Sequence, residues 1–296
     1  MTTTSAIPIT VDGVRLDTYA WNIETKNGRF YVPGVRGSNA QVPGRHGSLF
    51  VPSKKFDDGR FILSMWAQGT DVNGAAPGSG TEYNQFRKNM DQLMSLFTKR
   101  PFLMDVQKDD GSGTMRQAFC EVIQAIDPDV FGVNPTGKFT VELDIPGVFW
   151  QDTADQNYSS LTGVTTSFSF SLAAFAGATA PMEDLYLVVD GPIANPRIID
   201  AATGHYIQYN GTVAGGNQWV VNTTLWTSKV GAGIAFTQSG TDVTNLTVFT
   251  GAHAPRYLAL TPKNGDLTTA PTMQLTNTGS SSGATQMRVR GRRKFL

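Results

Sequence analysis

The sequence predicts a mainly β protein of two domains. The N-terminal domain, residues 1–152, is expected to be an α+β domain in which one helix packs on antiparallel strands. The C-terminal domain, residues 153–296, is expected to be a β-sandwich. Three observations support this: Gly, Thr, Ser and Asn separate many short apolar runs, a single segment shows helical periodicity, and strand-like runs recur every 8 to 12 residues from residue 183 onward.

The one expected helix covers residues 82–99. Thr81 is a suitable N-cap, and Pro101 cannot continue the helix. The preceding residues 69–80, GTDVNGAAPGSG, are expected to form a flexible loop that no core holds. The apolar residues of the helical segment recur at helical spacing and form one stripe: Phe86, Met90, Leu93, Met94 and Phe97.

A hairpin is expected over residues 50–66. Two apolar runs, SLFVP and RFILSMW, flank the polar turn Asp57-Asp58-Gly59, which is a strong hairpin signal. Another turn, at residues 43–47, precedes them, and its glycines indicate positive φ angles or close packing. The residues that define the whole pattern are Pro43, Gly44, Arg45, Gly47, Asp58, Gly59 and Arg60.

The second strand of this hairpin is apolar on both faces. Successive side chains of a strand point to opposite sides, so Phe61, Leu63 and Met65 share one face. Ile62 and Trp66 lie on the other. A strand with large apolar groups on both faces is usually covered on both. We therefore expect a core on one side and a partner on the other.

The remaining N-terminal strands are predicted to be a first set over residues 6–33, a second hairpin and one further strand. The runs PFLMDVQ and TMRQAFCEVIQAI flank a turn at residues 109–113. Residues 138–145, KFTVELDI, alternate between apolar and polar side chains and end at a Pro-Gly pair. Together with the helix, these strands complete the α+β domain.

Turn residues punctuate the C-terminal domain at regular intervals, which is typical of a sandwich. The run SFSFSLAAF, residues 167–175, is expected either to add a strand or to form part of an arm that links the domains. The turn residues that define the pattern of this domain are Gly191, Pro192, Asn195, Pro196 and Gly204.

These two patterns resemble one known family. The turn PGRHG, a short strand, then DGR and an apolar strand resemble the N-terminal domain of the distal tail proteins of long-tailed bacteriophages, the siphophages. Residues 191–226, GPIANPRIIDAATGHYIQYNGTVAGGNQWVVNTTLW, resemble the galectin-like C-terminal domain of the same proteins. In this segment and in the family's C-terminal domain, the same four features follow in this order: a G-P turn, an N-P-R/K-I strand, a T-G turn and a later apolar strand. Many family members carry inserted carbohydrate-binding modules, for which this chain has no room.

The resemblance implies a structural virion protein. Family members assemble as a hexameric ring that joins the tail tube to the tail tip or baseplate and surrounds the channel through which DNA leaves. For this chain the resemblance implies a ring-forming N-terminal domain, a galectin-like sandwich and a homo-oligomer. The implied partners are the tail tube protein, the tail-tip or baseplate hub protein and, as a further candidate, the tape-measure protein. DNA is expected only in transit, and the protein is expected at the tail tip of the virion after assembly in the host cytoplasm.

Composition argues against several other classes. The formal net charge is 0, so no global charge attracts nucleic acid or a membrane surface. Cys120 is the only cysteine, which excludes an internal disulfide. The first residues, MTTTSAIPIT, lack the pattern of a signal peptide. No apolar run is long enough to predict a membrane-spanning helix.

No catalytic, cofactor-binding or metal site is expected, and the protein is predicted not to be an enzyme. Residues 132–138, GVNPTGK, resemble a phosphate-binding loop, but Phe139 follows where Ser or Thr should bind magnesium, and a strand follows where a helix is required. Cys120 lies in mid-strand and is interpreted as a small buried hydrophobe. The histidines lie far apart in the sequence without the spacing of metal ligands: His46, His205 and His253.

The alternative function is a glycan-binding module for adsorption to the host cell wall. Several aromatic residues could stack on sugar rings, although a place in the sandwich core is the more frequent role: Tyr206, Tyr209, Trp219, Trp226 and Tyr257. The last ten residues, MRVRGRRKFL, are basic. We interpret them as a segment that contacts an acidic neighbour in an assembly, and we prefer this to contact with DNA or a solvated tail. Two further candidate functions are a cell-wall hydrolase and a different tail component with the same β fold.

Overall fold

The computed structural model of this protein describes residues 9–24, 33–36, 40–41, 48–49, 55–77, 81–98, 104–109, 113–124, 128–131, 135–160, 167–237, 239–251, 258–263, 266–278, 281 and 285–296. The chain divides into two compact units, unit 1 (Met1–Gln151, with Leu296) and unit 2 (Asp152–Phe295). Each unit is described by itself. Among the described residues there is one α-helix against many antiparallel strands, which confirms the prediction of a mainly β protein.

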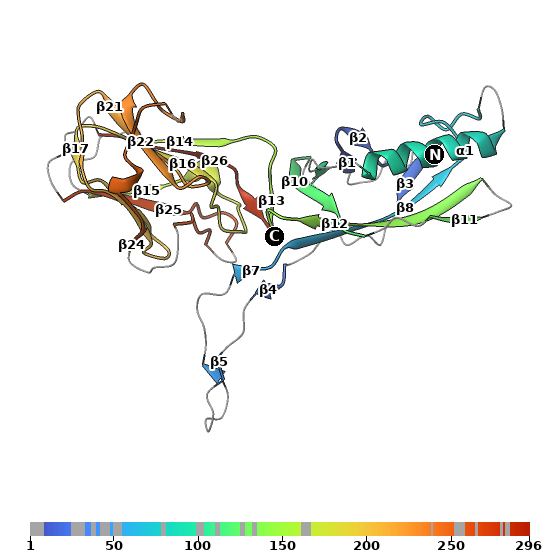
Figure 1. Cartoon of the computed structure of the whole chain (residues 1–296), viewed down its shortest axis with the longest axis horizontal. Helices are drawn as coiled ribbons and strands as arrows, with labels where there is room; N and C mark the ends of the chain where they lie inside the picture. Colours follow the sequence, from blue (N-terminus) through green and yellow to red (C-terminus); the bar gives the residue numbers. More distant parts are fainter. Residues whose placement is uncertain are drawn as a thin grey trace. The chain divides into compact units, whose positions relative to one another are not determined.

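Unit 1 is built on one antiparallel sheet (Figure 1). β11 (Asp129–Phe131) pairs with the first part of the central strand β12. β13 (Trp150–Asp152) lies at the boundary between the two units in the sequence. The predicted second hairpin is confirmed, because β9 and β10 pair along their length. The strand order is β2 (Val14–Arg15), β1 (Ile9–Val11), β9 (Met104–Asp109), β10 (Met115–Val122), β12 (Thr136–Ile145), β8 (Gly59–Gln68) and β3 (Trp21–Ile23).

The long strands β8 and β12 form the centre of this sheet. They pair from Gly59 opposite Ile145 to Gln68 opposite Thr136. Their side chains alternate between a buried face and a more exposed face, as the period of two requires. The predicted core face of β8 is confirmed for Leu63 and Met65, which are both buried. The buried face of the two strands holds Leu63, Met65, Ala67, Phe139, Val141, Leu143 and Ile145.

The helix α1 (Glu82–Phe97) lies along this buried face (Figure 1). Phe97 packs edge-to-face on Phe139, with ring centroids 6.4 Å apart. Phe86 fills the space beside Gly137, where an added Cβ would lie 3.0 Å from the Phe86 ring. The predicted apolar stripe is therefore correct, with Met94 half-buried and these members buried: Phe86, Met90, Leu93 and Phe97.

Both ends of α1 can be compared with the prediction. The Oγ1 of Thr81 accepts a hydrogen bond from the backbone N–H of Asn84, so Thr81 is the N-cap as predicted. The helix ends at Phe97 with Thr98 as its C-cap, earlier than the predicted end. Lys99 lies outside the described residues.

The hairpin predicted over residues 50–66 is wrong. Its two runs do not pair with each other, because β8 pairs with β12 and β3 instead. The segment before β8 instead pairs with residues that precede it in the chain. The two short antiparallel ladders that result are here called the arm. Pairing with β12 buries the apolar face of β8 in the core of the unit. This burial stabilises the fold more than a local hairpin turn would. The arm consists of β4 (Val35–Arg36) with β7 (Lys55–Phe56), and β5 (Ala40–Gln41) with β6 (Ser48–Leu49).

The loop that follows β8 is tied to α1 where it begins. Asn89 of α1 is buried, and its Nδ2 donates hydrogen bonds to the carbonyl oxygens of Gln68 at 2.7 Å and Thr70 at 2.8 Å. Gly74 lies against the ring of Tyr19, where an added Cβ would be 3.0 Å from the ring. The start of this loop is thus tied to α1, whereas residues 72–76 are exposed.

Unit 2 is a sandwich of two antiparallel sheets, as predicted (Figure 1). The six-stranded sheet has the order β14 (Gln156–Ser159), β26 (Met287–Gly291), β16 (Leu185–Asp190), β21 (Asn217–Asn222), β22 (Thr227–Ala232) and β23 (Thr241–Asp242). The five-stranded sheet has the order β15 (Ser167–Ser171), β25 (Thr272–Thr276), β18 (Arg197–Asp200), β19 (Tyr206–Tyr209) and β24 (Thr247–Gly251). The short elements are η1 (Ala173–Phe175), β17 (Ile193–Ala194), β20 (Thr212–Val213), η2 (Thr244–Leu246) and β27 (Lys294–Phe295).

The core of unit 2 lies between these sheets. Trp219 is fully buried there and stacks on Tyr209, with ring centroids 5.9 Å apart. The run SFSFSLAAF forms the edge strand β15 and the turn η1, so its expectation as an added strand is confirmed. The outer face of the six-stranded sheet is covered from within the unit, since Ile234 and Phe236 pack on Val188 and Val220.

Candidate functional site

The sheet of unit 1 has a second face, here called the open face, formed by the side chains of β8, β10 and β12 that point away from the buried face. The register places these side chains side by side across the three strands. They are a mixture of apolar, hydroxyl and charged groups. The outward residues are Arg60, Ile62, Ser64, Trp66, Phe119, Glu121, Lys138, Thr140, Glu142 and Asp144.

Three large apolar side chains of this region are exposed. The exposed fractions are 45% for Ile62, 42% for Phe119 and 43% for Ile123, which follows β10. Ile62 lies opposite Glu142, and the backbone N–H of Ile123 donates to the carbonyl oxygen of the same Glu142 at 3.1 Å. Ile62 and Ile123 therefore belong to one row across three strands. Exposed apolar side chains grouped on a sheet face favour contact with another protein surface.

The sequence predicted half of this apolar surface. Ile62 and Trp66 were expected on the outer face of β8, whereas Phe119 and Ile123 were not singled out. The same signal is present on the neighbouring strand, because the run AFCEVI is apolar at both odd and even positions. Apolar residues on both faces of β10 therefore indicate a second covered face as clearly as those of β8.

Charged side chains lie between and beside these apolar residues. Arg60 pairs with Glu142 at 3.0 Å. The next row along the sheet sets Arg60, Asp144 and Glu121 opposite one another. Burial and then the neighbouring charges of Asp58 and Glu121 raise the pKa of Asp144. Carboxylates thus outnumber the cation at this end of the open face.

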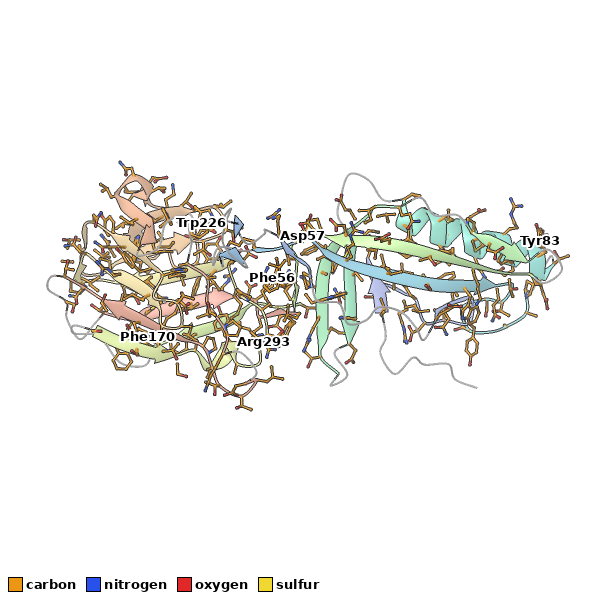
Figure 2. The ribbon with its side chains drawn as sticks, turned by 90° about the horizontal axis from the view of Figure 1, so that it is seen from below. Phe56, Asp57, Tyr83, Phe170, Trp226 and Arg293 are labelled. Carbon is orange, nitrogen blue, oxygen red and sulfur yellow. The ribbon has the colours of Figure 1, made fainter. Side chains whose placement is uncertain are left out.

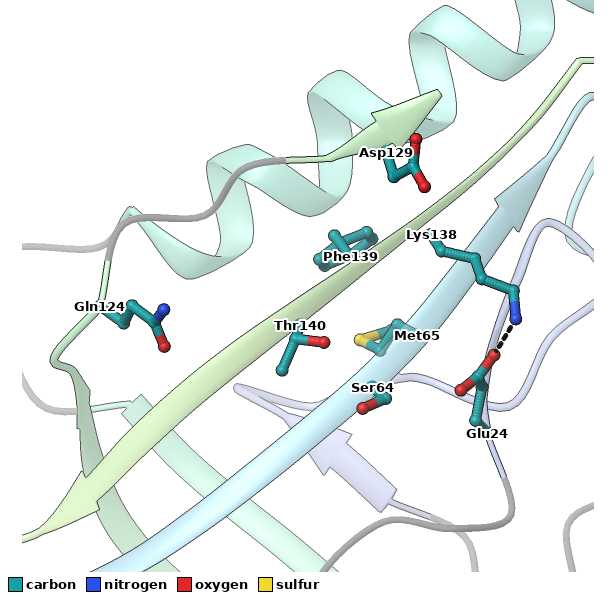
Figure 3. A pocket seen from close by; sticks show the side chains of 8 residues that line it. All are labelled: Glu24, Ser64, Met65, Gln124, Asp129, Lys138, Phe139 and Thr140. Atoms are coloured by element: carbon teal, nitrogen blue, oxygen red, sulfur yellow. Dashed lines mark ion pairs between the residues drawn. The ribbon is translucent and has the colours of Figure 1, made fainter. Parts of the chain in front are cut away.

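A cavity of about 290 Å³ lies farther along β8 and β12 (Figure 3). The Nζ of Lys138 pairs with the carboxylate of Glu24 at 2.5 Å, and both side chains are partly exposed. Such an exposed pair stabilises the fold little. The lining holds no arrangement of nucleophile and base that points to catalysis. It consists of Glu24, Ser64, Met65, Gln124, Asp129, Lys138, Phe139 and Thr140.

The signature residues of the N-terminal domain separate into two groups. Pro43, Gly44, Arg45 and Gly47 lie outside the described residues. The others lie where β7 leads into β8: Asp58, Gly59 and Arg60.

Gly59 is needed for close packing rather than for a turn. An added Cβ would lie 2.5 Å from the carbonyl oxygen of Val148 and 3.2 Å from the Cβ of Ile145. Just before it, Phe56 packs edge-to-face on Phe149 with ring centroids 5.3 Å apart, and Figure 2 labels Phe56 beside Asp57. The base of the arm is therefore fixed to the segment that follows β12.

The signature residues of the C-terminal domain are all turn or close-packing positions. Asn195 has a φ of 48° and Gly204 a φ of 73°, both in the left-handed region. An added Cβ at Gly191 would collide with the carbonyl oxygen of Ala214. Thr285 donates a hydrogen bond to the carbonyl oxygen of Pro192 at 2.9 Å. Pro196 accepts one from the backbone N–H of Tyr209 at 3.0 Å. These residues shape the turns and close contacts of the sandwich.

The cations of the basic C-terminus are paired with acids of unit 2, and the contact with a neighbouring subunit stays a prediction. Arg290 and Arg292 share Asp155 at 2.8 and 3.0 Å. Hydrogen bonds from these two arginines lower the pKa of Asp155, although burial acts in the opposite direction. Acids of the same unit balance the remaining cations: Arg288 with Asp190, Arg293 with Asp152 and Lys294 with Asp184.

The residues considered for catalysis or sugar stacking also take structural places. Burial raises the pKa of Cys120 to about 12, so this thiol stays protonated at neutral pH. Tyr209 and Trp219 lie in the core, and Trp226 packs edge-to-face on Phe249 with ring centroids 5.7 Å apart. The remaining candidates divide as follows: His205 is buried, Tyr206 is half-buried, and His46, His253 and Tyr257 lie outside the described residues.

Metal binding and membrane spanning find no support in the described residues. They contain no group of three or more His, Cys, Asp or Glu side chains placed to hold a metal ion. In the same part of the chain, no helix is long and apolar enough to cross a membrane.

Comparison with solved structures identifies the fold. The Dit protein of phage SPP1, described as a paradigm of the hub of the adsorption apparatus in phages that infect Gram-positive bacteria, matches 98% of this chain and 99% of its own, with a TM-score of 0.60 and 12% sequence identity. Chains of the phage p2 baseplate in its activated conformation match with TM-scores of 0.36 and 0.37 and identities of 12% and 11%, over 98% of this chain and 99% of theirs. Those scores are too low to establish a shared fold.

Comparison by sequence gives no further relative. No family model matches the chain, and no curated protein matches its sequence. The likeness to the SPP1 protein covers both units, and it confirms for the fold the resemblance to distal tail proteins. At 12% identity it establishes the fold alone.

Proposed function

We propose that this chain, which has the fold of a phage Dit protein, is a structural virion protein that forms the distal hub of a siphophage tail. In this proposal, unit 1 closes into a hexameric ring that joins the tail tube to the tail tip or baseplate and surrounds the channel through which DNA leaves. The observation that carries the proposal is the likeness to the SPP1 hub protein over 98% of the chain. Unit 2 then corresponds to the galectin-like domain.

The open face supports an assembly role. Ile62, Phe119 and Ile123 are each more than two-fifths exposed. Exposed apolar side chains on one sheet face, with charges such as Arg60 and Asp144 beside them, have the composition of a protein–protein interface. A closed ring needs two different surfaces that meet head to tail. We assign the open face of unit 1 to one of them.

The same proposal places the protein at the tail tip, with the tube protein, the tip or baseplate hub protein and the tape-measure protein as neighbours. It assigns no catalytic step. Burial of Cys120 and the pairing of the C-terminal cations within unit 2 support a structural role, since each group is used within the fold.

The experiment measures the mass of the purified full-length protein by light scattering and images the oligomer by negative stain. The wild type is expected to form six-fold rings with an open centre. The variant Ile62→Ser with Phe119→Ser removes apolar contact area and is expected to shift the protein to monomers at the same concentration. Val72→Ser is the matched control, because Val72 is 48% exposed in the same unit but lies off the open face.

Two outcomes would contradict the proposal in different ways. Rings in the double variant, as abundant as in the wild type, would assign the interface to another surface. A wild type that stays monomeric both alone and with the purified tail tube protein would overturn the hub function itself.

A further inference from the structure

The edge strand β15 of the five-stranded sheet lacks the features that normally protect a sheet edge. Edge strands usually carry charges, prolines or bulges that prevent pairing with another chain. The sequence of β15 is Ser-Phe-Ser-Phe-Ser, and the whole segment 156–182 contains no charged residue. The strand also pairs with β25 without a bulge, from Ser167 to Ser171. It is therefore suited to pairing with a further strand.

The opposite edge of the same sheet is protected. β24 pairs with β19 through a register shift between Tyr206 and Gln208, and such an irregularity twists an edge away from a partner. Thr247 of β24 is also tied to the other sheet, since its Oγ1 lies 2.7 Å from the Oγ of Ser228. Within the described residues, β15 is the edge of this sheet that remains open to pairing.

The direction of the backbone groups of β15 follows from one hydrogen bond. The N–H of Leu172 donates to the carbonyl oxygen of Pro271 at 2.9 Å, in continuation of the ladder with β25. In an antiparallel ladder, hydrogen-bonded pairs alternate with pairs that are not hydrogen-bonded. Phe168 and Phe170 therefore direct their backbone groups to β25. The serines direct theirs to the open edge: Ser167, Ser169 and Ser171.

An aromatic surface lies beside this edge. Phe168 and Phe170 share the core-facing side of β15, with ring centroids 4.9 Å apart, and Figure 2 labels Phe170. Tyr158 of β14 packs edge-to-face on Phe170 at 6.1 Å. Only 1% of Phe170 is exposed, against 43% of Phe168. The apolar core of unit 2 thus reaches the surface at β15.

The sequence of β15 reads the same in both directions, which makes the strand complementary to itself. An antiparallel pair centred on Ser169 sets Ser169 opposite its own copy and Ser167 opposite the copy of Ser171. These are the positions whose backbone groups point outward, so each serine pair can exchange two hydrogen bonds. Phe168 then lies opposite the copy of Phe170, at a position where facing side chains approach closely and aromatic pairs are favourable.

We propose that β15 pairs antiparallel with β15 of a second copy of this chain, in the register that sets Ser169 opposite itself. The pair joins two five-stranded sheets edge to edge and covers the exposed part of Phe168. The contact closes on itself, because it is two-fold symmetric and uses one edge of each copy. Neighbours in a six-fold ring are not related by a two-fold axis, so this contact goes beyond the hub function.

Cysteine cross-linking of the full-length protein tests the register. The Cα atoms of a hydrogen-bonded antiparallel pair lie about 5.5 Å apart, which a disulfide can span. Ser169→Cys is therefore expected to give a covalent dimer under mild oxidation. Ser167→Cys is the matched control in the same strand. Its two copies are four residues apart along the strands, about 13 Å, and are expected to stay unlinked. The native Cys120 is buried.

Sedimentation velocity measures the strength of the contact in the variant Ile62→Ser with Phe119→Ser, in which no ring is expected. Five residues per strand make a smaller contact than a stable dimer has, so dimers are expected only at concentrations above those that suffice for the ring. Ser169→Pro removes an outward N–H without a ladder bond to β25. It is expected to raise the Kd of the dimer about tenfold. Ser169→Thr keeps the N–H and is the control.

Absence of a cross-link in Ser169→Cys would overturn the proposal and leave the edge to a strand of another protein. Equal cross-linking of Ser169→Cys and Ser167→Cys would also overturn it, as would fibrous species, since a two-fold pair cannot grow. Near-ultraviolet circular dichroism reports whether each variant is folded. Ser169→Pro alone is expected to form rings like the wild type. A chain that forms no ring is still expected to give the Ser169→Cys dimer, so the two failures are separable.

Discussion

Arg293 donates two hydrogen bonds to the carboxylate of Asp152, 141 positions earlier in the chain, from Nε at 2.8 Å and from Nη2 at 3.0 Å. The backbone N–H of Asp152 donates to the carbonyl oxygen of Arg293 at 3.1 Å. The pair therefore joins the first residue of unit 2 to its C-terminal end. Figure 2 labels Arg293. Only 5% of the Asp152 side chain is exposed, so the pair is shielded from solvent on that side.

Replacing Asp152 by Asn is expected to destabilise unit 2 by about 2 kcal/mol, because a partly buried guanidinium loses its charged acceptor. Urea unfolding of the full-length protein checks this. Lys263→Gln is the control, because its pair with Asp266 is exposed and is expected to contribute less than about 0.5 kcal/mol. Equal losses of unfolding free energy in the two variants would show that the pair between Asp152 and Arg293 does not stabilise unit 2.

The effect of Asp155→Asn is expected to depend on pH. Hydrogen bonds from Arg292 and Arg290 hold the pKa of Asp155 below its ordinary value of 3.8, against the opposing effect of burial. The ionised carboxylate thus stabilises the fold above pH 3.8, and this contribution is lost as pH falls through the lowered pKa. The variant should unfold at a lower temperature than the wild type at pH 7, and the difference should shrink below pH 3.8. A difference that stays constant with pH would contradict the assignment.

Asp144→Asn is expected to change the unfolding temperature at pH 7 in the opposite direction to Asp155→Asn. Burial, followed by the charges of Asp58 and Glu121, raises the pKa of Asp144 above 3.8. Protonation is therefore favoured in the folded state, and the ionised form weakens the fold once pH exceeds the raised pKa. The variant should raise the unfolding temperature at pH 7 and leave it unchanged below pH 3.8. Asp91→Asn, an exposed carboxylate on α1, is the control, and a loss of stability at pH 7 specific to Asp144→Asn would refute the prediction.

Asn89→Leu is expected to cost about 2 to 3 kcal/mol. The variant leaves the carbonyl oxygens of Gln68 and Thr70 without the donor that α1 supplies. Thermal unfolding measures the change, and limited proteolysis should detect release of residues 69–77. Asn84→Ala on the exposed side of the same helix is expected to change stability by less than about 0.5 kcal/mol. If both variants behave alike, the loop is held by other contacts.

Gly191→Ala is expected to destabilise unit 2 by about 3 kcal/mol or to prevent its folding. The added Cβ would collide with the carbonyl oxygen of Ala214 and lie 2.6 Å from that of Val213, and backbone atoms in paired segments have little freedom to move. Gly215→Ala is the matched control, because its Cβ would meet only the Cδ of Pro192 at 3.8 Å. Yield and unfolding midpoint of the two variants give the comparison, and a well-folded Gly191→Ala protein would contradict the steric argument.

The sequence by itself determined the elements whose signals are local. Thr81 caps α1, and the apolar stripe of that helix faces the core, because capping and helical periodicity depend on a few neighbouring residues. The alternation of β8 and β12 could be predicted for the same reason, as could the spacing of short strands in unit 2. The exposed position of Ile62 followed from apolar residues on both faces of β8.

Tertiary structure decided which strands pair and which charges meet. A turn at Asp57-Asp58-Gly59 predicted a hairpin, but the burial available through β12 outweighs a local turn, so β8 pairs across the sheet. The hydrogen bonds from Asn89 to the loop after β8 depend on how α1 packs on the sheet, which the sequence pattern does not show. The C-terminal cations resemble a free basic tail in the sequence because their partners, such as Asp152 for Arg293, lie far away along the chain. Pairing energy depends on distance in space, which the order of residues does not give.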